Sequence, residues 1–517
     1  MTTITIDGSH LTLEQVMEVA RGDGQVAISP QALSRVDNGH RALQRLMREK
    51  DVIYGVNTGF GALANINISA DDLKLLQTNL IRSHATSVGK PHGQDVVRAM
   101  MLLRANTLLK GNSGIRSEVV NSIVRLLNRR IHPYVPEKGS VGASGDLSPL
   151  SHIALVLIGE GTAESGGKLI SGRKALQTAG CTPLQLEAKE GLALNNGTQQ
   201  MVAIGGLCLH DAYQLVSTAE AALSMSIEAI NGWIDAFDER VHRLRPHPGQ
   251  LIVAQHVRRL LEGSGMVRTS IGRRVADVRP QDPYSFRCAP QVMGASRDAL
   301  DFTRRVLEVE MNAATDNPLI FPRDDISISG GNFHGQPVAM SLDFMALAIS
   351  NLANVSERRI SALLDPSLNN GLPPFLVGRN TKPGLASGMM AVQYTATSLV
   401  AECKLLTHPA SSDSIPTSSN FEDFVSMGPG AAHKARTVLE YAQYTISIEL
   451  LVAAQGVDLR DKTSLGKGTR LVYRTIREKV DSMMDDRPSH DDIEEICKIV
   501  RKGEIAKIAA KITRDAD

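Results

Sequence analysis

The chain has 517 residues, of which 42% are hydrophobic and 21% charged, so it is long enough to bury a large core without disulfides or structural metals. Its 56 basic and 55 acidic residues nearly cancel, which argues against a dedicated nucleic-acid binder and against an anionic membrane surface as partner. Aromatic residues make up only 4%, which excludes extended base-stacking platforms and is atypical of an all-β protein.

The cysteines and the N-terminus indicate where the protein works. Five scattered cysteines form no CxxC pair, which indicates a reducing compartment and predicts no zinc site. They are Cys181, Cys208, Cys288, Cys403 and Cys497. The N-terminus lacks the basic and apolar segments of a signal peptide, and no charge-free apolar stretch is long enough to span a membrane. We therefore expect a cytoplasmic protein.

The first part of the chain mixes short strand and helix patterns. Thr2–Ile6 resembles a strand, and Thr12–Ala20 an amphipathic helix. From about Ser69 onward, apolar periodicity predicts helices over Asp71–Ser83, Gln94–Gly111 and Ser117–Arg129. An irregular stretch over 132–150, rich in Pro and Gly and flanked by apolar residues, indicates a functional loop rather than a linker.

The second half is dominated by long helical patterns with apolar residues around most of their circumference. They cover Met201–Ile234, Ala295–Ala314, Val338–Leu364, Gly388–Leu406 and Ala432–Gly456. Helices that are apolar nearly all round are buried in a bundle or in an oligomer interface. The charge-dense tail beyond Arg460 is typical of a helical surface layer. The pattern therefore predicts a mainly α protein with a long central helix bundle.

The loop from Gly139 to Leu150 has three possible interpretations. Its GxxGxxG spacing does not match a dinucleotide-binding fingerprint. It is also compatible with a tight turn in which Asp146 or Ser148 caps the next helix. In the third interpretation, Ala143-Ser144-Gly145 bends so sharply that the Gly145 nitrogen attacks the Ala143 carbonyl, an approach that a Cβ would block. Loss of two waters, one of them involving the Ser144 hydroxyl, would leave an electrophilic methylene group without an external cofactor.

This loop resembles the prosthetic-group loop of the histidine and aromatic amino acid ammonia-lyases. Other motifs of that family follow in the same order over roughly residues 50 to 430. They are Tyr54-Gly-Val-Asn-Thr-Gly-Phe-Gly61, Asn195-Asn196-Gly197-Thr198-Gln199, Gln281-Asp282-Pro283-Tyr284-Ser285-Phe286-Arg287, Gly331-Asn332-Phe333-His334-Gly335 and Asn420-Phe421-Glu422-Asp423. The chain is thereby identified as a member of this family.

The resemblance implies an architecture and a prosthetic group. The fold would be a bundle of the fumarase/aspartase-like type, with a mixed N-terminal domain over 1–200, a central long-helix bundle over 201–460 and a helical cap over 461–517. Ala143, Ser144 and Gly145 would form 4-methylideneimidazol-5-one, with no metal or external cofactor. The protein would be a homotetramer whose active sites are shared between chains.

The resemblance also assigns roles to single residues. Tyr54 would be the general base that removes the β-proton of the amino acid substrate, and we expect nearby positive charge to lower its pKa. Arg287 would bind the substrate carboxylate as a bidentate fork. Tyr284 and Asn196 would contact the prosthetic group and assist its formation. Gln281 and Phe333 would line the pocket.

Two features favour L-histidine as the substrate, with trans-urocanate and ammonia as products. Ser83-His84 stands where histidine lyases of the family carry this pair, and Glu422 stands where aromatic lyases carry glutamine. A carboxylate stabilises an imidazole ring but would be a costly buried charge against a phenyl ring. The last motif departs from the histidine-lyase form, because Phe421 and Phe424 replace polar side chains.

Alternatives remain open. Phe421 and Phe424 keep deamination of tyrosine or phenylalanine to a cinnamate in view, and an aromatic 2,3-aminomutase is a further possibility. A non-catalytic helical scaffold would be expected to lose part of the set Tyr54, Ala143-Ser144-Gly145 and Arg287, all of which are present.

Overall fold

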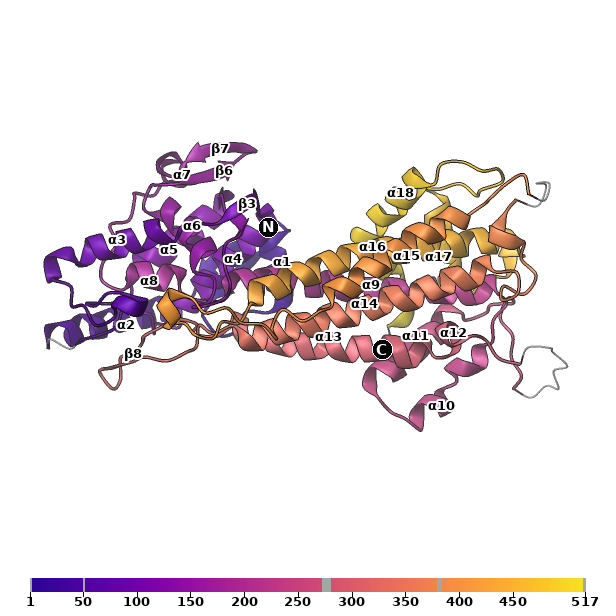
Figure 1. The fold of residues 1–517 in the computed structure, drawn as a ribbon, viewed down its shortest axis with the longest axis horizontal. Helices are drawn as coiled ribbons and strands as arrows, with labels where there is room; N and C mark the ends of the chain where they lie inside the picture. Colours follow the sequence, from indigo (N-terminus) through magenta and orange to yellow (C-terminus); the bar gives the residue numbers. More distant parts are fainter. Residues whose placement is uncertain (1, 50–51, 272–279, 379–383, 515–517) are drawn as a thin grey trace. The chain divides into compact units, whose positions relative to one another are not determined.

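The computed structural model describes residues 2–49, 52–271, 280–378 and 384–514. The chain is mostly helical with a few short strands, so the predicted mainly α class is confirmed (Figure 1). It divides into two compact units, each built from three separate segments of the chain. Unit 1 comprises Met1–Leu207, Thr303–Asp343 and Pro409–His433, and unit 2 comprises Cys208–Phe302, Phe344–His408 and Lys434–Asp517. The division into three consecutive domains stays a prediction.

Unit 1 combines short helices with small sheets. Its strands are β1 (Thr3–Ile6), β2 (Gln25–Ile28), β3 (Val88–Pro91), β4 (Ile131–Pro133), β5 (Pro136–Lys138), β6 (Thr162–Ser165), β7 (Lys168–Ser171), β8 (Leu319–Phe321) and β9 (Ile326–Ile328). The β1–β2 pair is parallel, whereas β3–β5, β4–β6–β7 and β8–β9 are antiparallel. Its helices are α1 (Leu13–Ala20), α2 (Pro30–Arg48), α3 (Leu73–His84), α4 (Gln94–Leu108), α5 (Ser117–Asn128), α6 (Leu147–Leu157), α7 (Gly172–Ala179) and α8 (Glu190–Asn195).

Helix α4 is the core of unit 1, since every residue from Val96 to Leu108 is buried. Two of those residues are arginines, whose guanidinium groups donate to backbone carbonyls. Arg98 donates to Val19 and Leu127, and Arg104 to Ala193 and Asn196. Such contacts offset the cost of burying a charged group.

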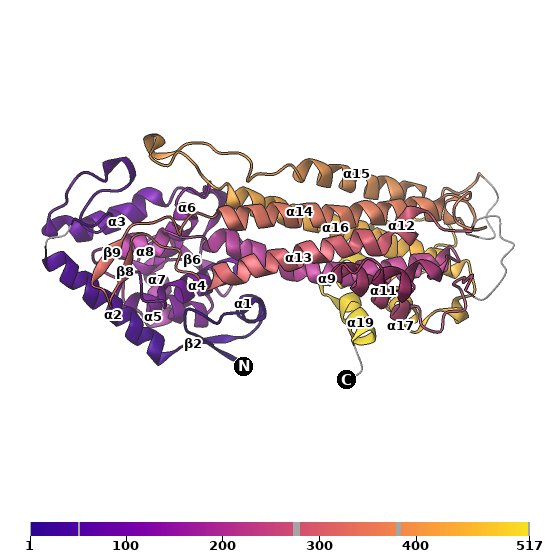
Figure 2. The same cartoon turned by 90° about the horizontal axis from the view of Figure 1, so that it is seen from below.

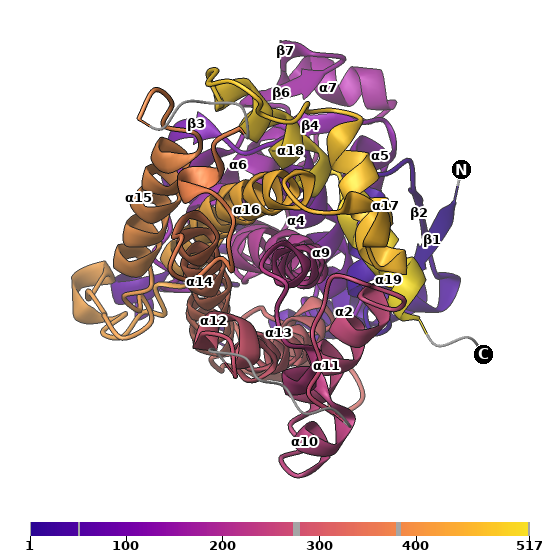
Figure 3. The ribbon, with the colours of Figure 1, turned by 90° about the vertical axis from the view of Figure 1, so that its right-hand side faces the viewer.

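Unit 2 is built from long helices. Four helices carry residues of both units: α9 (Gln199–Ala229), α13 (Ala289–Met311), α14 (Gln336–Leu364) and α16 (Gly428–Asp458). The others are α10 (Glu239–Arg243), α11 (Pro248–Leu260), α12 (Tyr284–Arg287), α15 (Met390–Leu406), α17 (Lys467–Arg477), α18 (His490–Arg501) and α19 (Glu504–Thr513). Viewed end-on, α9 lies among α16, α14, α13 and α11 (Figure 3), and α15 runs along the outside of α14 (Figure 2).

The central position of α9 explains its sequence, because a helix surrounded by others is apolar on most sides. Among the described residues, one helix, α14, is long and apolar enough to cross a membrane by length and composition. Since 72% of its most apolar window is buried inside the protein, it has the character of a core helix.

The predicted helices appear close to their expected bounds, whereas α2 was missed. Its buried residues, among them Ala32, Val36 and Leu43, recur at helical spacing, and Pro30 occupies the first helical position. The polar and charged residues between them dilute the apolar pattern.

Candidate active site

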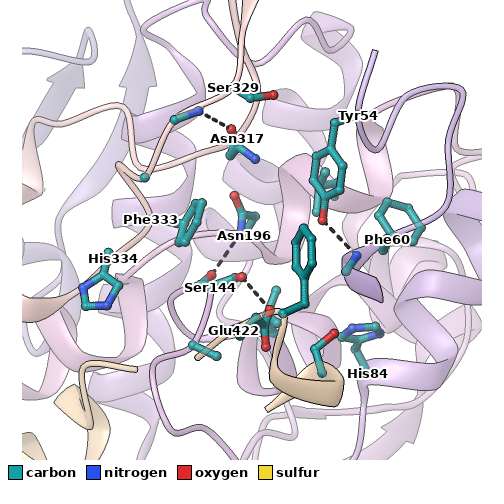
Figure 4. A pocket seen from close by; sticks show the side chains of 18 of the residues that line it. Tyr54, Phe60, His84, Ser144, Asn196, Asn317, Ser329, Phe333, His334 and Glu422 are labelled. Atoms are coloured by element: carbon teal, nitrogen blue, oxygen red, sulfur yellow. Dashed lines mark hydrogen bonds between the residues drawn. The ribbon is translucent and has the colours of Figure 1, made fainter. Parts of the chain in front are cut away.

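A cavity of about 820 Å³ in unit 1 gathers most of the predicted site residues (Figure 4). Its polar lining consists of Tyr54, His84, Ser144, Asn196, Asn317, Ser329, His334, Ser418, Glu422 and Asp423. Its apolar lining includes Phe60, Leu80, Ala143, Leu147, Leu192, Phe333, Phe421 and Phe424. The ionisable side chains among the lining residues that the structure describes are Tyr54, two carboxylic acids and two imidazoles, with no Lys or Arg. A ligand that carries a carboxylate therefore needs a cation from elsewhere.

The loop with Ala143-Ser144-Gly145 turns at Gly145, where it packs closely against Gly197. Gly145 has φ +74°, and a Cβ at this position would lie 2.2 Å from the Gly197 carbonyl oxygen. The Asp146 N–H donates to that same oxygen at 2.6 Å. Only glycine fits at residue 145, because both the backbone angle and the close approach exclude a side chain.

Asp146 stabilises a different helix from the one expected. It stands at the N-cap position of α6, but its side chain makes no capping bond there. Its Oδ2 accepts the backbone N–H groups of Gln200 and Met201 at 2.8 and 3.0 Å, in the first turn of α9. Burial raises the pKa of Asp146 to about 7, against the effect of these two donors. The residue thus ties the Ala143-Ser144-Gly145 loop to the start of α9.

Asn196 contacts the same loop from the α8–α9 turn. Its Nδ2 donates to the Ser144 carbonyl oxygen at 3.0 Å. Its Oδ1 is buried and has no hydrogen-bond partner within the part of the chain that the structure describes. A buried acceptor of this kind is costly, so it marks a place where a further donor would be stabilised.

Tyr54 lies in the predicted loop and points into the cavity, where its hydroxyl accepts the Gly61 N–H at 3.1 Å (Figure 4). The expectation of a lowered pKa is wrong for this pocket. Burial raises the pKa of Tyr54 and the charge of Glu422 raises it further, while the Gly61 donor offsets part of the effect. The physical reason is that burial disfavours the phenolate and that the lining adds the negative charge of Glu422, where the expectation required a cation.

Glu422 lies between the loop and His84 (Figure 4). Its Oε1 accepts the Ser144 hydroxyl at 3.0 Å, and its Oε2 accepts the Thr417 hydroxyl at 2.6 Å. Burial lowers the pKa of His84, whereas the Leu80 carbonyl and the charge of Glu422 act in the opposite direction. Phe421 and Phe424 therefore do not deprive Glu422 of hydrogen bonds, because Thr417 supplies one that does not depend on the Ser144 hydroxyl.

The structure also shows where Ser83, the residue before His84, and the Phe333 motif lie. Ser83 is exposed and does not line the cavity, but its hydroxyl lies 3.0 Å from His84 Nδ1. Phe333 lines the cavity. Its neighbour His334 stacks on the Phe424 ring at a centroid distance of 6.1 Å. Phe333, His334 and Phe424 thus line the cavity together, although Phe424 is far from the other two in the sequence.

Gln281, Tyr284 and Arg287 are not among the residues that line the cavity, and they belong to unit 2. Tyr284 is 69% exposed and Gln281 is exposed. The Arg287 guanidinium lies 4.5 Å from the centroid of the Tyr284 ring, and its Nε donates to the Asp282 carbonyl at 3.0 Å.

Sequence reasoning missed several lining residues. Leu192 lies one helical turn before Asn196, so its place on the same helix face was readable from the sequence. Asn317 carried no signal. It lines the cavity and accepts the Gly330 N–H at 2.8 Å, a contact between positions 13 residues apart.

Comparison with known proteins gives a consistent picture. The aromatic amino acid lyase family description matches residues 11–478. Histidine ammonia-lyase of Caldanaerobacter subterraneus subsp. tengcongensis is 49% identical over 508 residues, 98% of each chain. Among solved structures, histidine ammonia-lyase from Trypanosoma cruzi superposes with a TM-score of 0.90 at 39% identity, covering 100% of this chain and 96% of that one. Tyrosine aminomutase from Streptomyces globisporus superposes with a TM-score of 0.94 at 36% identity, covering 100% of both chains.

Proposed function

Because the chain belongs to the aromatic amino acid lyase family and is a carbon–nitrogen lyase, we propose that it eliminates ammonia from L-histidine to give trans-urocanate. The observation that carries this choice is Glu422, a carboxylate that lies in the cavity and accepts the Thr417 hydroxyl at 2.6 Å. A carboxylate there accepts an imidazole N–H and stabilises positive charge on the ring. The name of the 49% identical relative supports the same substrate.

The prosthetic group proposed for this site is 4-methylideneimidazol-5-one made from Ala143, Ser144 and Gly145. Three features fit it: the Cβ-free approach of Gly145 to Gly197, the position of Ser144 in the cavity wall, and the buried Oδ1 of Asn196. The group supplies an electrophile that captures the substrate, with no metal or external cofactor.

The side chains divide the remaining work. Tyr54 takes the β-proton, which requires its phenolate form. Its raised pKa makes that form scarce at neutral pH unless a cation is close. Arg287 supplies this cation and grips the substrate carboxylate as a fork. Tyr284 and Asn196 assist formation of the prosthetic group, and Gln281 and Phe333 complete the pocket.

Since α12 belongs to unit 2 and does not line the cavity of unit 1, we assign Gln281, Tyr284 and Arg287 to a cavity on another copy of the chain. The corresponding assembly is a homotetramer with shared sites, working in the cytoplasm on a free amino acid. The long, nearly all-round apolar helices agree with partners that cover them.

A second candidate is an aromatic lyase or 2,3-aminomutase. The superposition on a tyrosine aminomutase and the apolar surfaces of Phe421 and Phe424 favour it. A charged Glu422 opposite a phenyl ring disfavours it.

The test is to incubate the pure protein separately with L-histidine, L-tyrosine and L-phenylalanine. Ultraviolet absorbance follows each unsaturated acid, and amino-acid analysis detects any β-isomer. We expect the largest kcat/KM with histidine. Faster turnover of tyrosine or phenylalanine, or formation of a β-amino acid, would overturn the assignment.

Ser144→Ala provides the control for the prosthetic group. Without the hydroxyl, one of the two waters cannot leave and no methylene forms, so turnover should be abolished while the helical circular dichroism stays unchanged. Thr417→Val is the matched control, since it removes the other hydroxyl that donates to Glu422 and leaves the three loop residues intact. Normal turnover by Ser144→Ala would exclude the proposed electrophile.

A further inference from the structure

The turn between α8 and α9 accepts several hydrogen bonds from one buried cation. Arg104 on α4 is 1% exposed. Its Nη1 donates to the Asn196 carbonyl and to Gln199 Oε1, each at 2.8 Å, and its Nη2 donates to the Ala193 carbonyl. Ala193 and Asn196 lie at the C-terminal end of α8, where free carbonyls and the helix dipole favour a cation. Burial lowers the pKa of Arg104 to about 10, so it remains charged at neutral pH.

The same guanidinium packs directly against the backbone of Gly197. A Cβ on Gly197 would lie 2.5 Å from Arg104 Nη1 and 2.7 Å from Thr315 Oγ1. Gly197 also meets Gly145, because a Cβ on Gly145 would lie 2.3 Å from the Gly197 carbonyl carbon. Gly197 thus contacts both Arg104 and Gly145, and neither glycine leaves room for a side chain.

The contact with Gly197 involves Gly145, whose nitrogen must react when the prosthetic group forms. Ring formation joins the Gly145 nitrogen to the Ala143 carbonyl carbon. The Ala143 oxygen leaves as water with the amide hydrogens of Gly145 and Ser144, and a second water takes the Ser144 hydroxyl and its Cα hydrogen. No oxidant is needed. The Asn196 Nδ2 bond to the Ser144 carbonyl holds the middle of the same triad.

We propose that Arg104 is a positioning residue for formation of the prosthetic group: it fixes the Asn196–Gly197 backbone, against which Gly145 is pressed toward Ala143. The inference rests on the proposed electrophile and adds a requirement for its formation. Arg104 does not line the cavity and is not assigned any contact with substrate.

Helix α4 offers a matched control. Arg98 is 3% exposed, and burial lowers its pKa to about 10 as well. It also donates to two backbone carbonyls, those of Val19 and Leu127 at 2.8 and 3.0 Å. Arg98→Met therefore removes the same kind of charge and contacts from the same helix without touching the α8–α9 turn.

The experiment follows the loss of two waters by mass spectrometry of full-length chains at intervals after synthesis. Wild type, Arg104→Met, Arg104→Lys and Arg98→Met are compared, with Ser144→Ala as the sample that cannot complete the reaction. We expect Arg104→Met to slow the mass loss by about tenfold or more, because a misplacement of about 1 Å can cost a reaction about 10²-fold. Arg104→Lys should restore part of the rate, and Arg98→Met should mature like wild type at equal or greater loss of thermal stability.

The outcomes separate the two proposals. Full mass loss at the wild-type rate in both Arg104 variants overturns the role of Arg104 and leaves the electrophile standing. Equal slowing in Arg98→Met and Arg104→Met also overturns it, since general stability would then be the cause. If Arg104→Met does not fold, Arg104→Lys decides alone through its rate. If the wild-type chain never loses the two waters, the proposed electrophile is refuted, and the proposed role of Arg104 is refuted with it.

Discussion

The cavity of unit 1 and helix α12 of unit 2 both carry predicted site residues, but they are built differently. In the cavity, Tyr54, Ser144, Asn196 and Glu422 each make a hydrogen bond within their own unit. On α12, Tyr284 is largely exposed, and the Arg287 guanidinium that stacks on its ring donates to the backbone carbonyl of Asp282.

Under the proposed function, the difference indicates where the substrate carboxylate binds. The described cavity lining holds Glu422 and Asp423 but neither Lys nor Arg, so it suits an imidazole and repels a carboxylate. We propose that the cation that the reaction needs is Arg287 of α12. Under the proposed function, one chain supplies the acidic, preorganised half of a site and another chain supplies the cationic half.

The largest effects are expected from removing one member of each half. Tyr54→Phe should lower kcat by about 10²- to 10⁴-fold, the range for loss of a general base. Arg287→Met should lower kcat/KM by about 10²- to 10³-fold, as for loss of one partner of a buried charge pair. Tyr134→Phe, another tyrosine of unit 1 that does not line the cavity, should leave turnover unchanged in the same assay.

Co-expression of the two inactive variants then tests whether the halves come from different chains. If they do, mixed assemblies of Tyr54→Phe and Arg287→Met chains contain some sites with both native residues. Activity should return to about a quarter of wild type, since each site draws its halves from two chains at random. Separately purified variants mixed without subunit exchange should stay inactive. A co-purified mixed assembly that also stays inactive would place both halves on one chain.

The sequence predicted which residues line the cavity better than it predicted their pKa values and their hydrogen-bond partners. The spacing of the apolar residues located α3, α4 and the long helices, because burial on one face leaves a periodic record. The special geometry of Gly145 was foreseeable because only glycine permits it. The family motifs indicated Asn196 and Glu422, and both lie in the cavity lining.

What the sequence did not predict depends on distant contacts. Nothing in the residues near Asn317 indicated that it meets Gly330, and nothing near Arg104 indicated that it lies behind Gly197. The pKa of Tyr54 was predicted in the wrong direction, because that requires knowing which charges surround the side chain. Asp146 was one of two possible caps for the adjacent helix, whereas the donors it meets belong to α9.

A smaller effect is expected at Glu422. Glu422→Gln keeps the shape of the side chain but removes the charge that stabilises an imidazole, so kcat/KM for histidine should fall by about 10- to 100-fold, as for loss of a charged hydrogen bond. Turnover of phenylalanine should fall less or rise. Asp423→Asn is the control, since Asp423 lines the same cavity with no assigned contact to the ring. Equal losses for both amino acids would remove Glu422 from the choice of substrate.

The smallest effect is a shift of the pH profile of kcat. It tests whether Glu422 and Arg287 act on the pKa of Tyr54 in opposite directions. Under the proposed function Tyr54 acts as a phenolate, so a raised pKa means that the rate climbs with pH through the alkaline range until the hydroxyl is ionised. The Glu422 charge contributes to that rise in pKa, and removing a negative neighbour favours the phenolate. In Glu422→Gln the alkaline limb of the kcat profile should therefore move to lower pH. In Arg287→Met the same limb, measured on the residual activity, should move to higher pH, because a cation that stabilises the phenolate is lost. Profiles of kcat from pH 6 to 11 measure both shifts. If the two variants moved the limb in the same direction, Glu422 and Arg287 could not both act on Tyr54, and the cationic half of the site would have to be sought on another segment.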